Sequence, residues 1–240
     1  QGIKNLSCKD VRILMKDFLL NHLKYYDNSL KNRNKELSQR SWSKYLEYWD
    51  AEKIYFTKRQ VQSFLKPLSS LRDKNLVPLN FPNSLGAFGG IRCSVIANVY
   101  ATFLDNFTKI VDHKLSTWIS NIKDFSRDEF IDINYKERDY ASSEEEQQEL
   151  WRRKLKLELL RLKSAAGTLK LAKEKLKKRY LLLKKHYESY LEKNRSTSDL
   201  TQEGYVFGIW LKMFASSLDP HTSYLTAHEM AEFRISMNVS

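Results

Sequence analysis

Residues 93–119 carry the most regular apolar pattern in the chain, and this pattern restricts the possible folds more than any other feature. Apolar side chains recur there every three or four residues, the spacing that places them on one face of an α-helix. They are Ile96, Val99, Tyr100, Phe103, Leu104, Phe107, Ile110, Val111, Leu115 and Trp118. A helix with a continuous apolar face gains most of its stability by packing that face against other elements. We therefore predict one helix over 93–119 at the centre of the core.

Apolar side chains follow the same spacing in most of the remaining chain. The spacing predicts further helices over 7–26, 57–66, 143–166, 169–190 and 199–217. Another helix is expected to carry an aromatic stripe made of Trp42, Tyr45, Leu46 and Trp49. Because such stripes usually face a core, we interpret this one as core and not as a ligand cage. His22 also lies on an apolar face and is interpreted as a core histidine.

The remaining segments predict loops and one extended connection. The polar residues 27–38 and the proline- and glycine-containing residues 67–92 are expected to be loops, with Pro67 ending the helix before it. Apolar residues alternate within 125–140, which favours an extended segment. The whole chain has only seven glycines and four prolines, too few for a β-sandwich or barrel. The expected fold class is mainly α, an irregular multi-helix domain with long loops and one long basic helix or helix pair.

Polar side chains mark the starts of several predicted helices. Ser7 with Asp10, and Thr57 with Gln60, have the spacing of capping boxes, in which two side chains bond to free backbone amides. Ser143 is expected to cap the helix that follows it, whose first turn is acidic and suits the positive end of the helix dipole.

The positive charge of the chain is concentrated in one segment. Residues 150–195 contain 16 Lys and Arg and 4 Glu, so their net charge equals the +12 of the whole chain. Gly167 and Thr168 are expected to divide this segment into two helices. The candidate binding residues within it are Arg152, Arg153, Lys154, Lys177, Lys178 and Arg179.

This basic segment is open to three interpretations. It can be a solvated helical face without a binding role. It can attract the phosphates of a nucleic acid, although no helix-turn-helix, zinc or RNA-binding signature accompanies it. It can also dock onto an acidic protein, an anionic membrane or another part of the same protein.

The sequence contains no pattern for a catalytic, cofactor or metal site. His221, Ser223, His228 and Glu229 crowd one turn, where such side chains usually bond to backbone groups, so we interpret them as structural. No apolar run reaches the length of about 18 residues that a membrane span needs.

Two cysteines, Cys8 and Cys93, are too few for a zinc site without histidines at a matching spacing. On the residues alone they are interpreted as buried free thiols.

The C-terminal stretch is the most informative motif. Pro220 cannot continue the helix that arrives before it, and Thr226 with Glu229 is a capping box that opens another helix. The motif that joins these two predicted helices consists of Leu218, Asp219, Pro220, His221, Thr222, Ser223, Tyr224 and Leu225. This order of residues resembles the tail-specific, or carboxyl-terminal-processing, serine proteases.

Residues 45–64 resemble the same family. There Tyr45-Leu46 is followed by Asp50, a short connector and a helix that opens at Thr57. Trp49 stands where the family usually has a leucine, and this departure leaves the pattern readable.

The resemblance implies a helical, non-catalytic N-terminal domain over residues 1–235, with 236–240 beginning the connection to a PDZ-containing protease body. The serine and lysine of that body would lie outside this chain, so no catalytic residue, cofactor or metal is expected here. It further implies a periplasmic location, and the absence of a signal peptide at Gln1 then fits a mature form, whereas a cytosolic protein is the other reading. In an oxidising compartment a Cys8–Cys93 disulfide is as strong an expectation as two free thiols.

The expected partners follow from the same resemblance. They are the protein's own PDZ and protease domains, unfolded or C-terminally tagged substrates and an adaptor lipoprotein, whereas nucleic acid is not expected. The domain would scaffold the protease body and shape the access of substrate or adaptor. The alternative is a free-standing basic helical module that binds nucleic acid or an acidic protein.

Overall fold

The computed structural model describes residues 6–25, 34–69, 93–132, 134–196, 202–218 and 224–225. Most of these residues are helical, which confirms the expected mainly α class. The elements are α1 (Cys8–Tyr25), α2 (Asn34–Trp49), α3 (Lys58–Ser69), α5 (Cys93–Lys109), the π-helical turn η3 (Ile110–Lys114), α6 (Leu115–Asn121), α7 (Glu144–Ala166), α8 (Leu169–Ser196) and α9 (Gln202–Leu218). Within the described ranges the β-structure is limited to one isolated bridge, between Thr57 and Ala141.

The two predicted capping boxes are present at the starts of α1 and α3. Ser7 Oγ accepts a hydrogen bond from the Asp10 amide at 3.2 Å, and Asp10 Oδ2 accepts one from the Ser7 amide at 2.8 Å. Thr57 and Gln60 exchange the equivalent pair at 3.3 and 3.0 Å. Each box satisfies amides that a helix start leaves without a partner, so the sequence positions these helix starts locally.

The start and end of α7 also agree with the sequence. Ser143 Oγ accepts from the Glu146 amide at 3.2 Å and caps the helix. At the other end Gly167 has φ of 79°, a conformation that glycine adopts without steric cost. The chain therefore leaves α7 after Ala166 and begins α8 at Leu169, as predicted.

The prediction of one regular helix over 93–119 is wrong at its middle. The α-helix α5 ends at Lys109, and the turn η3 precedes α6. In that turn the Leu115 amide donates to the Ile110 carbonyl, a step of five residues in place of four. This wider step stacks Ile110 above Leu115, and both are buried although regular α geometry would separate them around the helix.

Several predicted boundaries are also wrong. The loop predicted over 27–38 ends earlier, because α2 begins at Asn34. Leu37, in the first turns of α2, is buried, and its carbonyl accepts a hydrogen bond from Ser41 Oγ at 2.8 Å. Pro67 does not end α3, which continues to Ser69; the fixed φ of proline is compatible with a helical backbone. The polar residues 194–199 predict a break after the basic helix, but α8 extends to Ser196, so the helix continues into that stretch.

Other predictions lie outside the described part of the chain. They concern residues 70–92 of the long loop, the side chain of His22 and the connection at 236–240. The described residues of 125–140 form no helix, but a turn at 135–137, with the Glu137 amide bonded to the Asn134 carbonyl at 3.2 Å, interrupts the expected extended segment.

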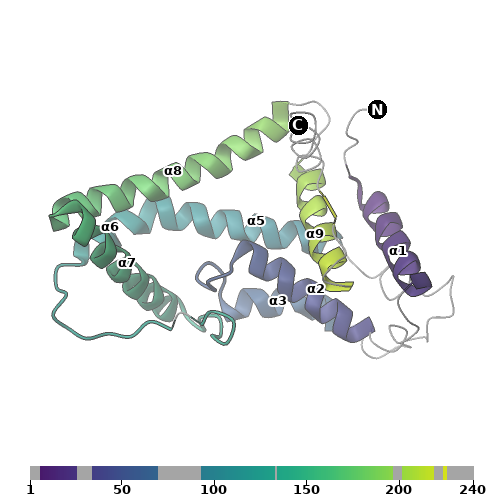
Figure 1. The fold of residues 1–240 in the computed structure, drawn as a ribbon, viewed down its shortest axis with the longest axis horizontal. Coiled ribbons are helices and arrows are strands. Elements are labelled where there is room, and N and C mark those ends of the chain that lie inside the picture. The colour runs from purple at the N-terminus through teal and green to yellow at the C-terminus, as the bar shows by residue number, and fades with distance from the viewer. Residues whose placement is uncertain are drawn as a thin grey trace. The chain divides into compact units, whose positions relative to one another are not determined.

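The chain divides into two compact units, and the first comprises Gln1–Trp49, Phe64–Tyr100 and Lys193–Ser240. In this unit α9 packs against both α1 and α2 (Figure 1). The aromatic stripe of α2 is core, as predicted: the Trp42 and Tyr45 rings lie 4.3 and 5.4 Å from the Trp210 ring. Tyr45 also donates its hydroxyl to the Ile96 carbonyl at 2.9 Å.

Helix α9 is buried around most of its circumference, whereas the sequence predicted one apolar face. Its buried side chains are Val206, Phe207, Ile209, Trp210, Leu211, Phe214, Ala215, Ser217 and Leu218. A helix that is apolar on nearly every side is typical of a central position in a core. In the first unit this position belongs to α9.

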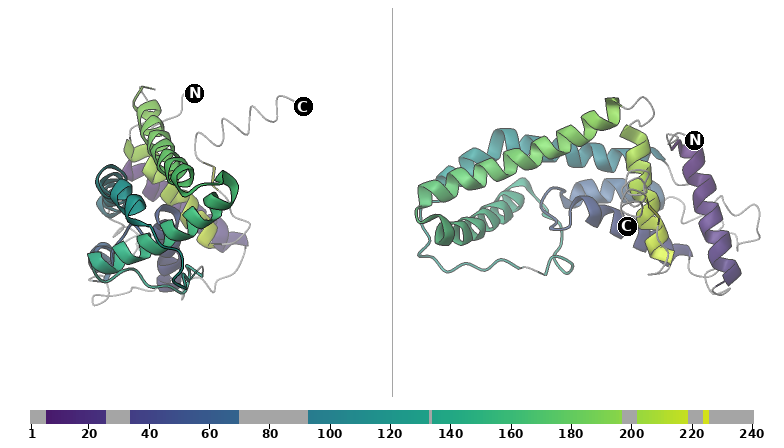
Figure 2. Two further views of the ribbon diagram at one scale, coloured as in Figure 1. Left: turned by 90° about the vertical axis from the view of Figure 1, so that its left-hand side faces the viewer. Right: turned by 45° about the horizontal axis from the view of Figure 1, so that its top comes forward.

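The second unit comprises Asp50–Ser63 and Ala101–Glu192. Its helices α7 and α8 meet near Gly167, beside α6, and diverge from there (Figures 1 and 2). The core of this unit consists of Ile54, Ile110, Leu115, Ile119, Ile122, Trp151, Leu155, Leu159, Ala172, Leu176 and Tyr180. Trp151 lies among them, donating its Nε1 hydrogen to the Ile54 carbonyl at 3.1 Å.

A disulfide within the first unit joins Cys8, the first residue of α1, to Cys93, the first residue of α5. The two Cα atoms are 5.9 Å apart and the residues are separated by 85 positions in the sequence. A crosslink that closes a loop of this length lowers the entropy of the unfolded chain and so stabilises the folded one.

We expect the Cys8→Ser/Cys93→Ser variant to lose about 2–4 kcal/mol of unfolding free energy, the usual contribution of a disulfide that closes a long loop. Urea unfolding of the oxidised protein and of the variant measures the difference. As a control, a reducing agent should destabilise the wild type and leave the variant unchanged. Equal unfolding midpoints for wild type and variant under oxidising conditions would contradict the expected role of the bond.

Candidate functional site

The candidate site is a charged surface and not an enclosed centre. Among the described residues, no group of three or more His, Cys, Asp or Glu side chains could hold a metal ion. None of the helices in the described ranges is both long enough and apolar enough to cross a membrane. Binding residues are therefore sought on α7 and α8, which carry the excess positive charge.

Arg152 of α7 is engaged within the second unit. Its guanidinium donates two hydrogen bonds to the Glu129 carboxylate, at 2.8 and 3.1 Å, and two to the Glu149 carboxylate, both at 2.7 Å. Arg153 donates to the same Glu149 carboxylate at 2.9 Å. The bonds from Arg152 hold the pKa of Glu129 and of Glu149 down to about 2. Both carboxylates stay ionised over the ordinary pH range, and Arg152 is consequently a bridging residue and not a free cation.

A second cation, Lys156, also binds the Glu129 carboxylate. Lys156 has a buried side chain, and its Nζ donates to Glu129 Oε2 and to the Arg127 carbonyl, each at 3.0 Å. Glu129 and Arg127 belong to the irregular segment between α6 and α7. The described residues of this segment have one isolated bridge, at Ala141, and the cations of α7 attach the segment to the helix.

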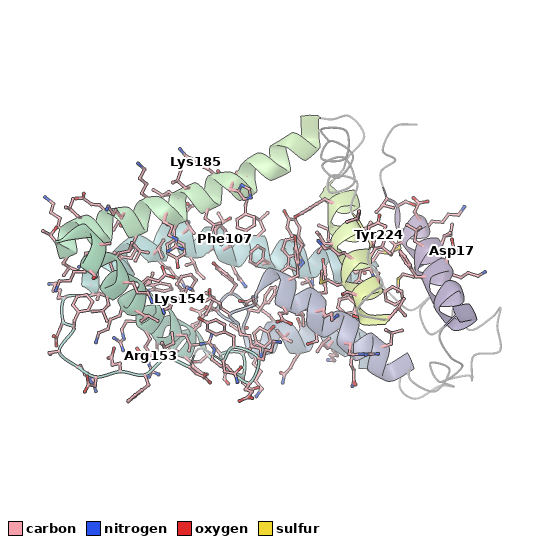
Figure 3. The ribbon with its side chains drawn as sticks, in the orientation of Figure 1. Asp17, Phe107, Arg153, Lys154, Lys185 and Tyr224 are labelled. Atoms are coloured by element: carbon pink, nitrogen blue, oxygen red, sulfur yellow. A yellow bond between two sulfur atoms is a disulfide. The ribbon has the colours of Figure 1, made fainter. Side chains whose placement is uncertain are left out.

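Lys154 faces the interior of the second unit, whereas Arg153 points outward from α7 (Figure 3). The Lys154 Nζ lies 2.6 Å from Glu52 and 3.0 Å from Glu158, with only 15% of the side chain exposed. Burial lowers the pKa of Lys154, but the ion pairs with Glu52 and Glu158 outweigh this and hold the pKa above its ordinary value. The charge of Lys154 is thus neutralised internally.

The three predicted binding residues of α8 are more accessible. Lys177 donates to Ser120 Oγ at 3.1 Å, which ties it to α6. Lys178 and Arg179 are exposed, and no ion pair joins either of them to a residue in the described ranges. Of the six predicted binding residues, Lys177, Lys178 and Arg179 therefore have no carboxylate partner among the described residues, and only Lys178 and Arg179 are also exposed without a side-chain hydrogen bond to another helix.

The apolar stripe predicted along α8 is only partly a packing surface. Ala172, Leu176 and Tyr180 are buried, but Leu183 is exposed. Farther along, the Tyr187 ring packs 5.1 Å from the Phe107 ring of α5. The backbones of α7 and α8 diverge from Gly167 (Figure 1).

The C-terminal motif is described at its two ends, both in the first unit. Leu218 is buried at the end of α9. The Tyr224 ring makes an edge contact with the Phe18 ring of α1 at 6.0 Å, and Leu225 is partly exposed. Asp219, Pro220, His221, Thr222 and Ser223 lie outside the described residues, as does the capping box of Thr226 with Glu229.

Asp50 has a role that sequence reasoning did not assign. Its buried carboxylate accepts hydrogen bonds from the amides of Ile54, Tyr55 and Phe56 at 2.8, 2.9 and 2.8 Å. Burial raises the pKa of Asp50 to about 6, against the effect of the three amide bonds, so the group is ionised at pH 7 and can accept all of them. The sequence feature that could have indicated this role is an aspartate directly after the aromatic stripe, at the point where the chain must turn.

We expect Asp50→Asn to lower the unfolding free energy by about 2–4 kcal/mol at pH 7. The amide group of asparagine is a donor and would face amide donors, leaving backbone groups unpaired at about 1–3 kcal/mol each. Urea unfolding measures the loss. The matched control is Asp139→Asn, a strongly exposed aspartate of the same unit, which should change stability by less than about 0.5 kcal/mol. Equal effects of the two substitutions would refute the role given to Asp50.

The ion pairs of Arg152 predict an acid-sensitive stability. Glu129 and Glu149 have folded-state pKa values of about 2, below their ordinary value, so their contribution is full at neutral pH and is lost as the pH falls from about 4.5 to 2. Arg152→Gln should make stability less dependent on pH in this window. Urea unfolding at pH 2–7 tests this, with Lys178→Gln as the control that keeps the wild-type dependence. An identical pH profile for wild type and Arg152→Gln would contradict the coupling.

The chain is similar to a known protein family over most of its length. A family model described as the tail specific protease N-terminal domain matches residues 19–228. The match includes the stretch 45–64 and the motif Leu218–Leu225, on which the sequence resemblance rests, and it also includes the basic helices. No curated protein matches the chain. Since the family model covers most of the 240 residues, the chain belongs to the family of tail-specific protease N-terminal domains.

Proposed function

We propose that this chain is the non-catalytic helical N-terminal domain of a periplasmic tail-specific serine endopeptidase, an enzyme that degrades or processes proteins from their C-terminal end. The observation that carries the proposal is the family match over residues 19–228. In this role the domain scaffolds the protease body and shapes the access of substrate or adaptor. Its partners are the PDZ and protease domains of the same protein, unfolded or C-terminally tagged substrates and an adaptor lipoprotein.

The internal use of the α7 cations supports a scaffolding role. Arg152, Lys154 and Lys156 bond to carboxylates of their own unit and attach irregular segments of the chain to α7. Such pairs hold side chains and loops in one arrangement, which a domain needs if it is to position another domain. A nucleic-acid interface would require these cations to face solvent.

The disulfide supports the proposed location. Bonds such as that between Cys8 and Cys93 form and persist in oxidising compartments, of which the bacterial periplasm is one. In a reducing cytosol the same pair would be kept as thiols.

The proposal predicts proteolysis by the product of the complete reading frame that contains this sequence. That protein should cleave an unfolded substrate with an apolar C-terminus, and the 240-residue chain by itself should not. The matched control substrate is identical except for two aspartates at its C-terminus, and it should be cleaved at least tenfold more slowly. Gel electrophoresis of timed samples measures the rates.

Two outcomes of this experiment would contradict the proposal. If the complete protein cleaves neither substrate, the assignment as a protease is wrong. Equal cleavage of both substrates removes the recognition of C-terminal ends while leaving a protease.

A further inference from the structure

Three consecutive leucines of α8 are exposed to solvent. The side chains of Leu181, Leu182 and Leu183 are exposed by 50%, 56% and 37%. Successive residues of an α-helix are about 100° apart, so the three leucines cover more than half of the circumference. They form a convex apolar patch, which we call the leucine patch.

Exposed cations surround the leucine patch. Lys178 and Arg179 precede it and Lys185 follows it, all three exposed, and Lys185 points away from α5 (Figure 3). No acidic residue occurs between Glu174 and Glu188. One side of the helix carries Leu171, Lys175, Lys178, Leu182 and Lys185 at a spacing of three or four residues, and every one of them is exposed.

The remaining cations of this stretch mark the side of α8 that faces its own unit. Lys184 lies 2.6 Å from Asp112 of the π turn, and Lys177 bonds to Ser120 of α6. Tyr180 and Tyr187, on the same side, pack their rings against Trp151 and Phe107. The charges of Lys178, Arg179 and Lys185 are therefore not needed for packing within the unit.

The shape and the charge of the patch favour one kind of partner. A protein would have to wrap a groove around a convex arc of three leucines, whereas lipid headgroups rearrange around a protruding apolar side chain. Leucines can enter the boundary between headgroups and acyl chains, and long lysine and arginine side chains can extend toward lipid phosphates. Each cation near an anionic bilayer contributes about 1 kcal/mol.

We propose that the leucine patch and its flanking cations bind the surface of an anionic phospholipid membrane, with α8 lying along that surface. Leu181 and Leu182 enter the headgroup region, and Lys178, Arg179 and Lys185 contact phosphates. This binding surface is separate from proteolysis, so its test is independent of the protease assay above.

The experiment is cosedimentation of the full chain with lipid vesicles at low ionic strength. One set of vesicles contains equal parts of phosphatidylglycerol and phosphatidylcholine, and the other contains phosphatidylcholine alone. Binding is expected to the anionic set only. Lys178→Gln/Lys185→Gln should weaken it about 30-fold, from two cations at about 1 kcal/mol each, and Leu182→Ser about fivefold.

Matched variants control for changes elsewhere on the surface. Ile13→Ser removes an apolar side chain of similar exposure, 48%, from α1 and should bind like the wild type. Lys123→Gln/Lys136→Gln removes two exposed lysines from the connection between α6 and α7 and should weaken binding less than the α8 pair. Circular dichroism melting curves verify that all variants are folded.

Four results would overturn the proposal. They are no binding to anionic vesicles, equal binding to both kinds of vesicle, unchanged binding by Leu182→Ser, and equal weakening by the control lysine pair. If the chain binds polyglutamate and not anionic vesicles, with the same loss in the Lys178→Gln/Lys185→Gln variant, the surface serves an acidic protein and the membrane assignment is wrong.

Discussion

The packing around Trp151 is the interaction on which the second unit depends. Its fully buried ring lies within 6.0 Å of the rings of Tyr55, Trp118 and Tyr180, measured between ring centroids, and its nitrogen donates to the Ile54 carbonyl. One side chain thus connects the turn after α2 with α6, α7 and α8. Aromatic contacts of this kind add about 0.5–1.5 kcal/mol each beyond the burial of their area, so the position of α7 follows from them.

The residues that surround each turn of α7 determine which carboxylates its cationic side chains contact. Lys154 meets Glu52 and Glu158 on the inner side, and Arg152 meets Glu129 of the irregular segment. Half-buried charges need such partners, because removal from water is costly without them. Fewer cations of α8 meet carboxylates, and Lys178, Arg179 and Lys185 flank exposed leucines. Two helices of similar composition therefore differ in the placement of their charges, since most named cations of α7 are paired within the unit and several of those on α8 are exposed.

The first unit relies on other constraints. Its central helix α9 is enclosed by apolar contacts, among them a tilted contact of the Trp210 ring with Trp42 and an edge contact with Tyr45, both of α2. The disulfide of Cys8 with Cys93 and the edge contact of Phe18 with Tyr224 add connections between segments distant in the sequence. Of these contacts, the one between Phe18 and Tyr224 joins the first helix of the chain to a residue of the Leu218–Leu225 motif.

The sequence by itself determined the mainly α class, the caps at Ser7, Thr57 and Ser143, and the break at Gly167, because each depends on neighbours in the chain. It also carried the family, through residue order in two motifs. Only the tertiary structure decided the π turn at Ile110, the burial of Asp50 and the division of the basic residues into paired and exposed sets. These depend on partners such as Glu52 and Lys154, 102 positions apart, and local periodicity contains no information about which distant side chains will meet.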